Sequence, residues 1–436
     1  MRIFKSIGKR LRSDSRFAYE AMMYGSRQFA KWKIENSTTI LERRKKILFL
    51  CLLPVLFLAG LEFVHAVEIP SIIGGKHAYA PSFATMEMFF VSILIGLAAG
   101  LITGCIGAGG GFILTPALMS VGVKGIMAVG TDMFHIFAKA IMGATLHRKM
   151  GNVSAGLAIT FLIGSLAGAT AGGLIQRAIY TTNPALSDAF IGVLYVVVLG
   201  FIGFFTLFDF LKARKQPQGS GGAHDAPSEM TNISVKMQSL KAPPYIKFDQ
   251  NKKLSAYPII LLGVIVGIVA ALMGVGGGFL FFPSFVYILG VSAHTTVGTD
   301  IFQIIFTAGY ASIFQYAVYG FVFYTLAMGL LLGSLIGIQI GAITTSIVSG
   351  IVIKGFFALT VLGGFANRLF DLPNALVNAG YLKVSPTLLN IFDFLSFYLF
   401  FAIIAVFGVW VIYSFFKGMP KIRQAAFEDQ QEHNET

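Results

Sequence analysis

The chain has 436 residues, of which 56% are hydrophobic and only 12% are charged, and its mean hydropathy is +0.76. A soluble domain of this length would carry about a quarter charged residues, so the composition excludes a soluble enzyme or binding domain. The net charge of +13 is concentrated in two segments: residues 1–46 contribute +9 and residues 212–256 contribute +5, while residues 417–436 contribute −1.

The basic segments predict how the chain is oriented. Lys and Arg are enriched in the cytoplasmic parts of membrane proteins, so we expect the N-terminal extension (1–46), the linker (212–256) and the C-terminal tail (417–436) to be cytoplasmic. The protein is then a multi-pass protein of the cytoplasmic (inner) membrane. A basic head can also bind nucleic acid, but its position before an apolar run favours anionic lipid headgroups as the partner, and no nucleic acid.

Long apolar runs follow one another along the chain. A run of about 17 or more residues can cross a hydrocarbon core that is roughly 30 Å thick. The sequence therefore predicts an all-α polytopic membrane protein with about 10–12 membrane segments. A first span is expected at 47–66 and a last span at 388–416. Between them, apolar segments lie at 86–106, 110–122, 126–146, 153–176, 187–211, 257–273, 276–290, 296–317, 321–345 and 348–366.

The sequence indicates that residues 86–211 and 257–366 are two copies of one unit. Three motifs of the first copy recur in the same order in the second, shifted by 167, 168 and 169 residues. The pairs are Gly109-Gly110-Gly111-Phe112 with Gly276-Gly277-Gly278-Phe279, Val129-Gly130-Thr131-Asp132 with Val297-Gly298-Thr299-Asp300, and Gly164-Ser165-Leu166 with Gly333-Ser334-Leu335. Internal repeats of this kind are common in secondary transporters.

The number of segments per copy predicts inverted repeats. Each copy has five segments, and an odd number places the second copy upside down. The basic residues His147-Arg148-Lys149 follow the third segment of copy one, whereas residues 317–320 at the matching place are uncharged. If the short second segments, 110–122 and 276–290, re-enter the membrane rather than span it, the copies would be parallel instead.

The glycine triplets predict broken helices with an anion site. Glycine lets the backbone unwind, and the half-helix that follows presents N–H groups and a partial positive charge to an anion. The alternative is that the glycines only permit close helix packing. The predicted substrate-binding residues are these glycines and the threonines of the second motif: Gly109, Gly110, Gly111, Thr131, Gly276, Gly277, Gly278 and Thr299.

The carboxylates of the second motif predict proton coupling. Ionisable groups inside a membrane are costly and usually functional. His135 and Lys139 lie three and seven residues after Asp132, so the three side chains share one helical face, whereas copy two has neutral residues at both places. The alternative is an inert ion pair that fixes helix register, and the threonines could simply bond back to their own helix. The predicted proton-coupling residues are Asp132, His135, Lys139 and Asp300.

These motifs resemble the TauE/SafE family of sulfite exporters over roughly residues 86–366. The resemblance implies a transporter that exports small sulfur-containing anions such as sulfite or organosulfonates. From the repeats and the glycine motifs we hypothesise a secondary transporter that works by alternating access. The sequence predicts no catalytic residues, no cofactor and no metal site. One alternative is a transporter of another solute, namely a carboxylate, an amino acid or a metal ion. Another is a membrane-embedded enzyme or a receptor. The two cysteines, Cys51 and Cys105, allow no disulfide framework.

Overall fold

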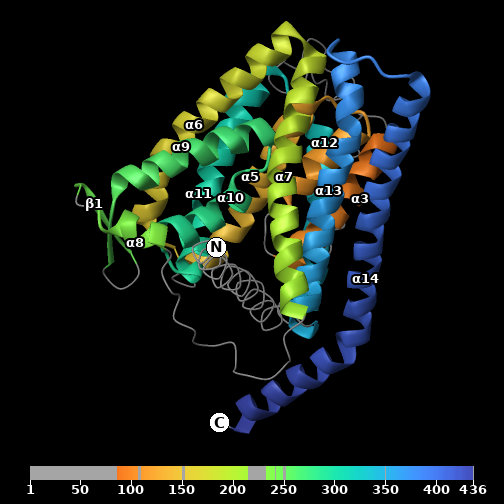
Figure 1. The fold of residues 1–436 in the computed structure, drawn as a ribbon. Helices are drawn as coiled ribbons and strands as arrows, with labels where there is room; N and C mark the ends of the chain where they lie inside the picture. Colours follow the sequence, from red (N-terminus) through yellow and green to blue (C-terminus); the bar gives the residue numbers. More distant parts are fainter. Residues whose placement is uncertain are drawn as a thin grey trace, which may run out of the picture.

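A computed structural model describes residues 86–106, 110–149, 153–214, 232–240, 242–248, 252–348 and 350–435. The basic extension (1–46), the predicted first span (47–66) and Gly109 lie outside the described residues. Every apolar segment predicted between 86 and 416 is helical (Figure 1). The helices are α3 (Met86–Ile106), α4 (Gly111–Ser120), α5 (Gly125–Lys149), α6 (Ala155–Thr182), α7 (Pro184–Arg214), α8 (Asn232–Gln238), α9 (Ala256–Met273), α10 (Gly278–Pro283), α11 (Ala293–Tyr310), α12 (Tyr324–Ile347), α13 (Gly350–Asn378) and α14 (Pro386–Glu435).

Long apolar helices dominate the described part of the chain. Seven of them are long and apolar enough to cross a membrane: α3, α6, α7, α9, the α11 region, α12 and α14. Helices α5 and α13 have 25 and 29 residues but carry several charged side chains. The prediction of an all-α polytopic membrane protein is confirmed.

The second segment of each predicted copy is short. Helix α4 has ten residues, so at about 1.5 Å per residue it is about 15 Å long, half of a hydrocarbon core. Helix α10 has six residues and continues as a π-helical turn, η2 (Ser284–Leu289). The prediction left open whether these segments span the membrane, and α4 is too short to cross it alone.

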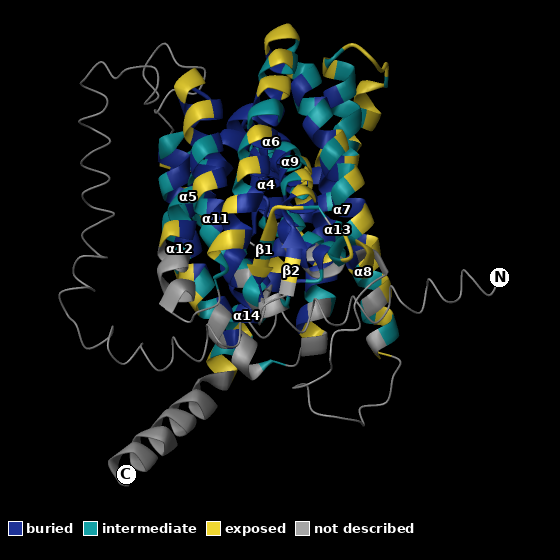
Figure 2. Cartoon of the chain, turned by 90° about the vertical axis from the view of Figure 1, so that its left-hand side faces the viewer, coloured by how far each residue is buried: buried dark blue, intermediate teal, exposed yellow. Residues whose placement is uncertain are grey.

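The exterior of the bundle is apolar. Buried residues fill the interior, and exposed residues lie on the outer faces and at the ends of the helices (Figure 2). Many of the exposed side chains on the long helices are large and hydrophobic, for example Phe201 with 75% of its surface exposed and Val409 with 68%. Because water would penalise such surfaces, these faces are suited to lipid.

Glycines bring helices of the two halves into close contact. Helix α12 packs on α3, and α6 packs on α9. A Cβ atom at Gly333 would lie 2.5 Å from the backbone nitrogen of Leu97, and one at Gly164 would lie 2.9 Å from that of Val264. Both distances are too short for a carbon atom, so only glycine allows these two contacts.

The predicted linker (212–256) contains secondary structure. Strands β1 (Tyr245–Phe248) and β2 (Lys252–Ser255) form an antiparallel hairpin, and α8 precedes it. Phe248 and Leu254 are buried in one hydrophobic cluster with Phe161 of α6 and Phe285 of η2. The described part of the linker therefore folds against the ends of α6 and the α10–η2 segment.

Candidate functional site

Both predicted glycine breaks are present. Gly110 precedes α4 with φ of 70°, and Gly276 and Gly277 precede α10 with φ of 67° and 88°. These left-handed conformations favour glycine strongly. At the second break, the buried hydroxyls of Tyr195 and Tyr316 donate to the carbonyls of Met273 and Ala271. The last turn of α9 is therefore satisfied by side chains where the helix ends.

The two breaks lie against each other. A Cβ atom at Gly111 would lie 3.0 Å from Cα of Val275, and one at Gly276 would lie 2.8 Å from the side chain of Ile136 on α5. One at Gly278 would lie 2.8 Å from Oδ2 of Asp300. The glycines predicted to bind substrate therefore meet beside α5 and α11. In this conformation protein atoms fill the space next to Gly111 and Gly276, so an anion between the breaks requires Ile136 or Val275 to move.

Asp132 and His135 form a fully buried pair on α5. Thr115 of α4 donates a hydrogen bond of 3.1 Å to Oδ2 of Asp132, and Oδ1 lies 3.6 Å from Nδ1 of His135. Both residues have 0% exposure. Among the described residues neither Oδ1 nor Nδ1 has a hydrogen-bond partner. At 3.6 Å the two atoms lie next to each other but are too far apart for a hydrogen bond.

Ser334 of α12 fixes the other side of the imidazole. Its Oγ lies 2.9 Å from Nε2 of His135 and 3.2 Å from the carbonyl oxygen of Leu331. A hydroxyl has one hydrogen to donate and can also accept. Ser334 can thus donate to a neutral His135, or accept from a protonated one while it donates to Leu331. It satisfies Nε2 of His135 in both protonation states.

Lys139 completes the predicted charged face of α5. It interacts electrostatically with both Asp132 and His135. The structure therefore brings together the three ionisable residues that the spacing in the sequence predicts. Asp300 is separate from them, on α11.

The matching place in the second half holds an uncharged network around Asp300. Gln303 donates to Oδ1 of Asp300 at 3.0 Å, and Thr307 donates to Gln303 at 2.8 Å. The hydroxyl of Thr307 lies 2.8 Å from that of Ser165 on α6. Ser165 and Ser334 come from the same repeated Gly-Ser-Leu motif, so each of these serines faces the aspartate-bearing helix of the other half.

The two motif threonines make contacts that neither sequence interpretation anticipated. Thr131 accepts a hydrogen bond of 3.0 Å from the backbone nitrogen of Phe323, and Thr299 accepts one of 3.1 Å from that of Ser154. Phe323 and Ser154 immediately precede α12 and α6. Each threonine therefore holds the start of a helix of the opposite half, rather than bonding back to its own helix. Their role as substrate ligands stays a prediction.

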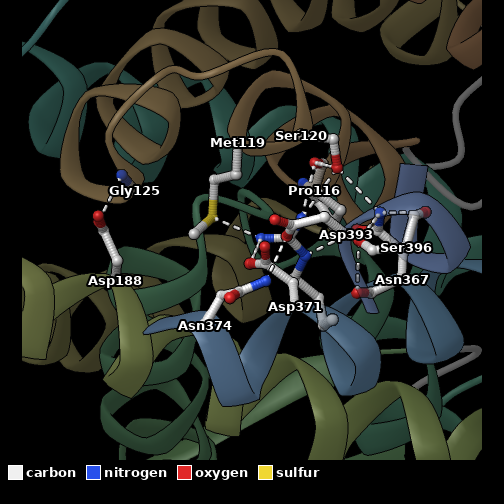
Figure 3. Close-up of polar contacts among 11 residues, drawn as sticks. Pro116, Met119, Ser120, Gly125, Asp188, Asn367, Asp371, Asn374, Asp393 and Ser396 are labelled. Carbon is white, nitrogen blue, oxygen red and sulfur yellow. Dashed lines mark hydrogen bonds and ion pairs between the residues drawn. The ribbon is translucent and has the colours of Figure 1, made fainter. Parts of the chain in front are cut away.

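A second buried polar cluster surrounds Arg368 of α13, and sequence reasoning missed it. All five N–H groups of the guanidinium have acceptors; these are Asn367, Asp371, Met119, Ser120 and the carbonyl oxygen of Pro116. Figure 3 shows these partners, which come from α4 and α13. Asn367 also donates to Ser396 of α14. Arg368 and Asn367 thus fasten α4 to α13 and α14.

Helix α13 is longer than the apolar segment predicted at 348–366. Helix α13 continues past 366 to Asn378, with Pro373 inside it. Charged residues and a proline usually end an apolar span, but here the helix continues through them and Arg368 is buried in the bundle. The spacing of three between Arg368 and Asp371, which places both on one helical face, was the signal available in the sequence.

No metal site is built by the described residues, which contain no group of three or more His, Cys, Asp or Glu side chains able to hold an ion. Apolar spanning helices, helices broken at glycines and buried ionisable groups are the features of a multi-pass membrane transporter. The chain belongs to the TauE/SafE family: the profile described as "Sulfite exporter TauE/SafE" matches residues 92–367.

Curated relatives are similar over most of their own length. "Probable membrane transporter protein YjnA" of Bacillus subtilis (strain 168) is 29% identical over 253 residues, which is 57% of this chain and 87% of that protein. "Probable membrane transporter protein YunE" of the same organism is 25% identical over 262 residues, 58% of this chain and 87% of the relative. A "Probable membrane transporter protein" of Xylella fastidiosa (strain 9a5c) is 24% identical over 261 residues, which is 59% of this chain and 85% of that protein. No solved structure matches the chain.

Proposed function

We propose that this membrane transporter is a proton-coupled exporter of small sulfur-containing anions, sulfite or organosulfonates, across the cytoplasmic membrane. The observation that carries the proposal is the buried Asp132–His135 pair, which lies beside two facing glycine breaks. The description of the family, which names sulfite export, supports the choice of substrate. The anion binds between the breaks after Ile136 or Val275 moves, and the pair gains or loses a proton in the same cycle.

The hydrogen bonds around His135 support the proton step. Without an added proton, Ser334 donates to Nε2 and the imidazole N–H points from Nδ1 toward Asp132. With one, both imidazole nitrogens carry hydrogen, Ser334 accepts, and Asp132 faces a positive charge. In both states Ser334 pairs with Nε2 and the hydrogen on Nδ1 points toward Asp132, so the pair can change its charge without a change of partners. Copy two has Asp300 but neutral residues at the places that match His135 and Lys139. We therefore assign the proton-binding pair to copy one.

The proposed mechanism is alternating access by two inverted copies. Helices α7 and α13, which occupy matching places in the copies, touch along their length (Figure 1). Gly192 near the start of α7 faces Leu372 near the end of α13, and Phe210 near the end of α7 faces Gly355 near the start of α13. Helices that run in opposite directions are what an inverted relation requires of this pair.

Cysteine labelling tests the inverted arrangement. In a variant without Cys51 and Cys105, we expect a membrane-impermeant maleimide to label Thr182→Cys, at the end of α6, from outside right-side-out vesicles. Val348→Cys, at the matching end of α12, should react only after permeabilisation, because α7 and α13 start at opposite ends of the bundle. Labelling of both positions from the same side would contradict the inverted copies.

Uptake into proteoliposomes tests the substrate class. We expect labelled sulfite or sulfoacetate to enter faster than into protein-free liposomes. Acetate, alanine and a divalent metal ion should not, since the proposed site is built for a small sulfur oxyanion. Transport of acetate, alanine or the metal ion in place of both sulfur anions would replace the proposal with the corresponding alternative. Turnover of a substrate in detergent, without a sealed compartment, would indicate an enzyme.

A further inference from the structure

Arg177 lies near the end of α6, part-buried and fixed in position. Its Nη1 donates to both the backbone oxygen and Oε1 of Gln315, each at 2.8 Å. Its guanidinium carbon lies 4.0 Å from the centre of the Tyr319 ring. A Cβ atom at Gly173, one turn earlier on α6, would lie 2.7 Å from Oε1 of Gln315, so glycine there is what lets Gln315 approach.

These contacts leave one edge of the guanidinium for a ligand. The two hydrogens of Nη1 are engaged by Gln315, and the Tyr319 ring covers one face. Within the part of the chain that the structure describes, neither Nε nor Nη2 of Arg177 has a hydrogen-bond partner, and no carboxylate is within ion-pair distance of it. The Nε–Nη2 edge matches two oxygens of an oxyanion. A guanidinium already held in place loses little entropy on binding.

A row of uncharged polar groups leads from Arg177 into the bundle. Gln315 donates to the hydroxyl of Tyr310 at 3.3 Å, and that hydroxyl lies 2.8 Å from Oγ1 of Thr170. Further along the same two helices, α6 and α11, lie Ser165 and Thr307, which connect through Gln303 to Asp300 beside the glycine break. We call Thr170, Tyr310, Ser165, Thr307 and Gln303 the α6/α11 polar row.

Arg177 could instead serve only as a helix clamp that caps the carbonyl oxygen of Gln315. Such a clamp needs only a hydrogen-bond donor, and a positive charge is not required for it. Here the part-buried guanidinium has no carboxylate partner among the described residues, and its Nε–Nη2 edge can hold an anion with charge-assisted hydrogen bonds. The polar row runs from Arg177 along α6 and α11 toward Asp300, which lies beside the second glycine break.

We propose that Arg177 is an anion subsite at the far end of the α6/α11 polar row, where it binds two oxygens of a sulfonate or similar small oxyanion. The ligand class rests on the proposed function. The site itself does not include Asp132, His135 or the glycines. By the predicted orientation it lies at the outer end of the path, where an exported anion would leave.

Binding of sulfoacetate to the purified full-length chain in detergent tests the subsite, for example by isothermal titration. Arg177→Gln should weaken binding on the order of tenfold or more, since charge-assisted hydrogen bonds are lost. Arg177→Lys should lie between this variant and the wild type, because an ammonium keeps the charge without the two-pronged edge. Lys383→Gln is the matched control, an exposed cation lost from the α13–α14 connection, and should bind as the wild type does.

Each other outcome overturns a defined part of the account. Equal affinity of Arg177→Gln and wild type would remove the subsite and leave anion transport standing. An equal loss in Lys383→Gln would assign the effect to general charge and also remove the subsite. A wild-type protein that binds no anion would overturn both the subsite and the proposed function. If Arg177→Gln does not give a monodisperse protein, the Arg177→Lys variant decides: full affinity there contradicts the two-pronged edge.

Discussion

Asp132→Asn should abolish transport driven by a pH gradient, reducing it to the level of protein-free liposomes. The substitution keeps the size of the side chain and its ability to accept from Thr115, but it removes the charge that faces His135. Without that charge, protonation of the buried imidazole has no compensation. Exchange of labelled for unlabelled anion at equal pH should survive, because it needs no net proton movement.

The control is Asp393→Asn, the same chemical change on α14, where the carboxylate accepts from Asn374 and lies outside the α5 pair. Transport by this variant should match the wild type. Asp300→Asn should also reduce gradient-driven transport, since the carboxylate beside the second glycine break is lost. Full gradient-driven activity in Asp132→Asn at normal expression would remove the proton role of the pair and leave it a structural contact.

Arg368→Ala should destabilise the protein by about 3 kcal/mol or more, because it removes a large, fully buried side chain and leaves its acceptors unpaired. Five acceptors lose a donor at once, and Pro116 and Ser120, in the last turns of α4, lose their connection to α13. We expect the temperature at which half of the monodisperse protein is lost in detergent to fall by many degrees. Arg368→Lys should be intermediate, since three donors cannot replace five.

Asp371→Asn tests how much of the stability comes from the charge of Asp371 and how much from the hydrogen bonds of Arg368. The amide oxygen introduced by this substitution can still accept from Nη1 of Arg368, and the other partners of Arg368 remain. We expect this variant to lose much less stability than Arg368→Ala. If Arg368→Ala unfolds at the wild-type temperature, the cluster in Figure 3 does not fasten α4 to the bundle.

The broken helices and the charged face of α5 could be predicted from the sequence, because both depend on local spacing. Glycine permits a positive φ wherever it occurs, and residues three and seven apart share a helical face in any helix. Both signals are present in a short stretch of chain. The charged trio Asp132, His135 and Lys139 is found together for this reason.

The partners of these residues could not be predicted in the same way. Ser334 reaches His135 across 199 positions, and Thr131 meets the backbone of Phe323 across 192. Which faces of two apolar helices meet is decided by tertiary packing, and serine or threonine in an apolar helix gives no sign of its partner. The same holds for Arg368, whose acceptors on α4 lie far from it in the sequence.

The central claim is that a sulfur anion and a proton move in one cycle, and the direct measurement is proton movement driven by the anion alone. Proteoliposomes would contain a pH-sensitive dye, start at equal pH on both sides with the voltage clamped, and receive a gradient of sulfoacetate, which is ionised at pH 7 and cannot carry the proton itself. The account predicts a change of internal pH that requires the wild-type protein and is absent with Asp132→Asn. Movement of labelled sulfoacetate with no change of pH would contradict the coupling.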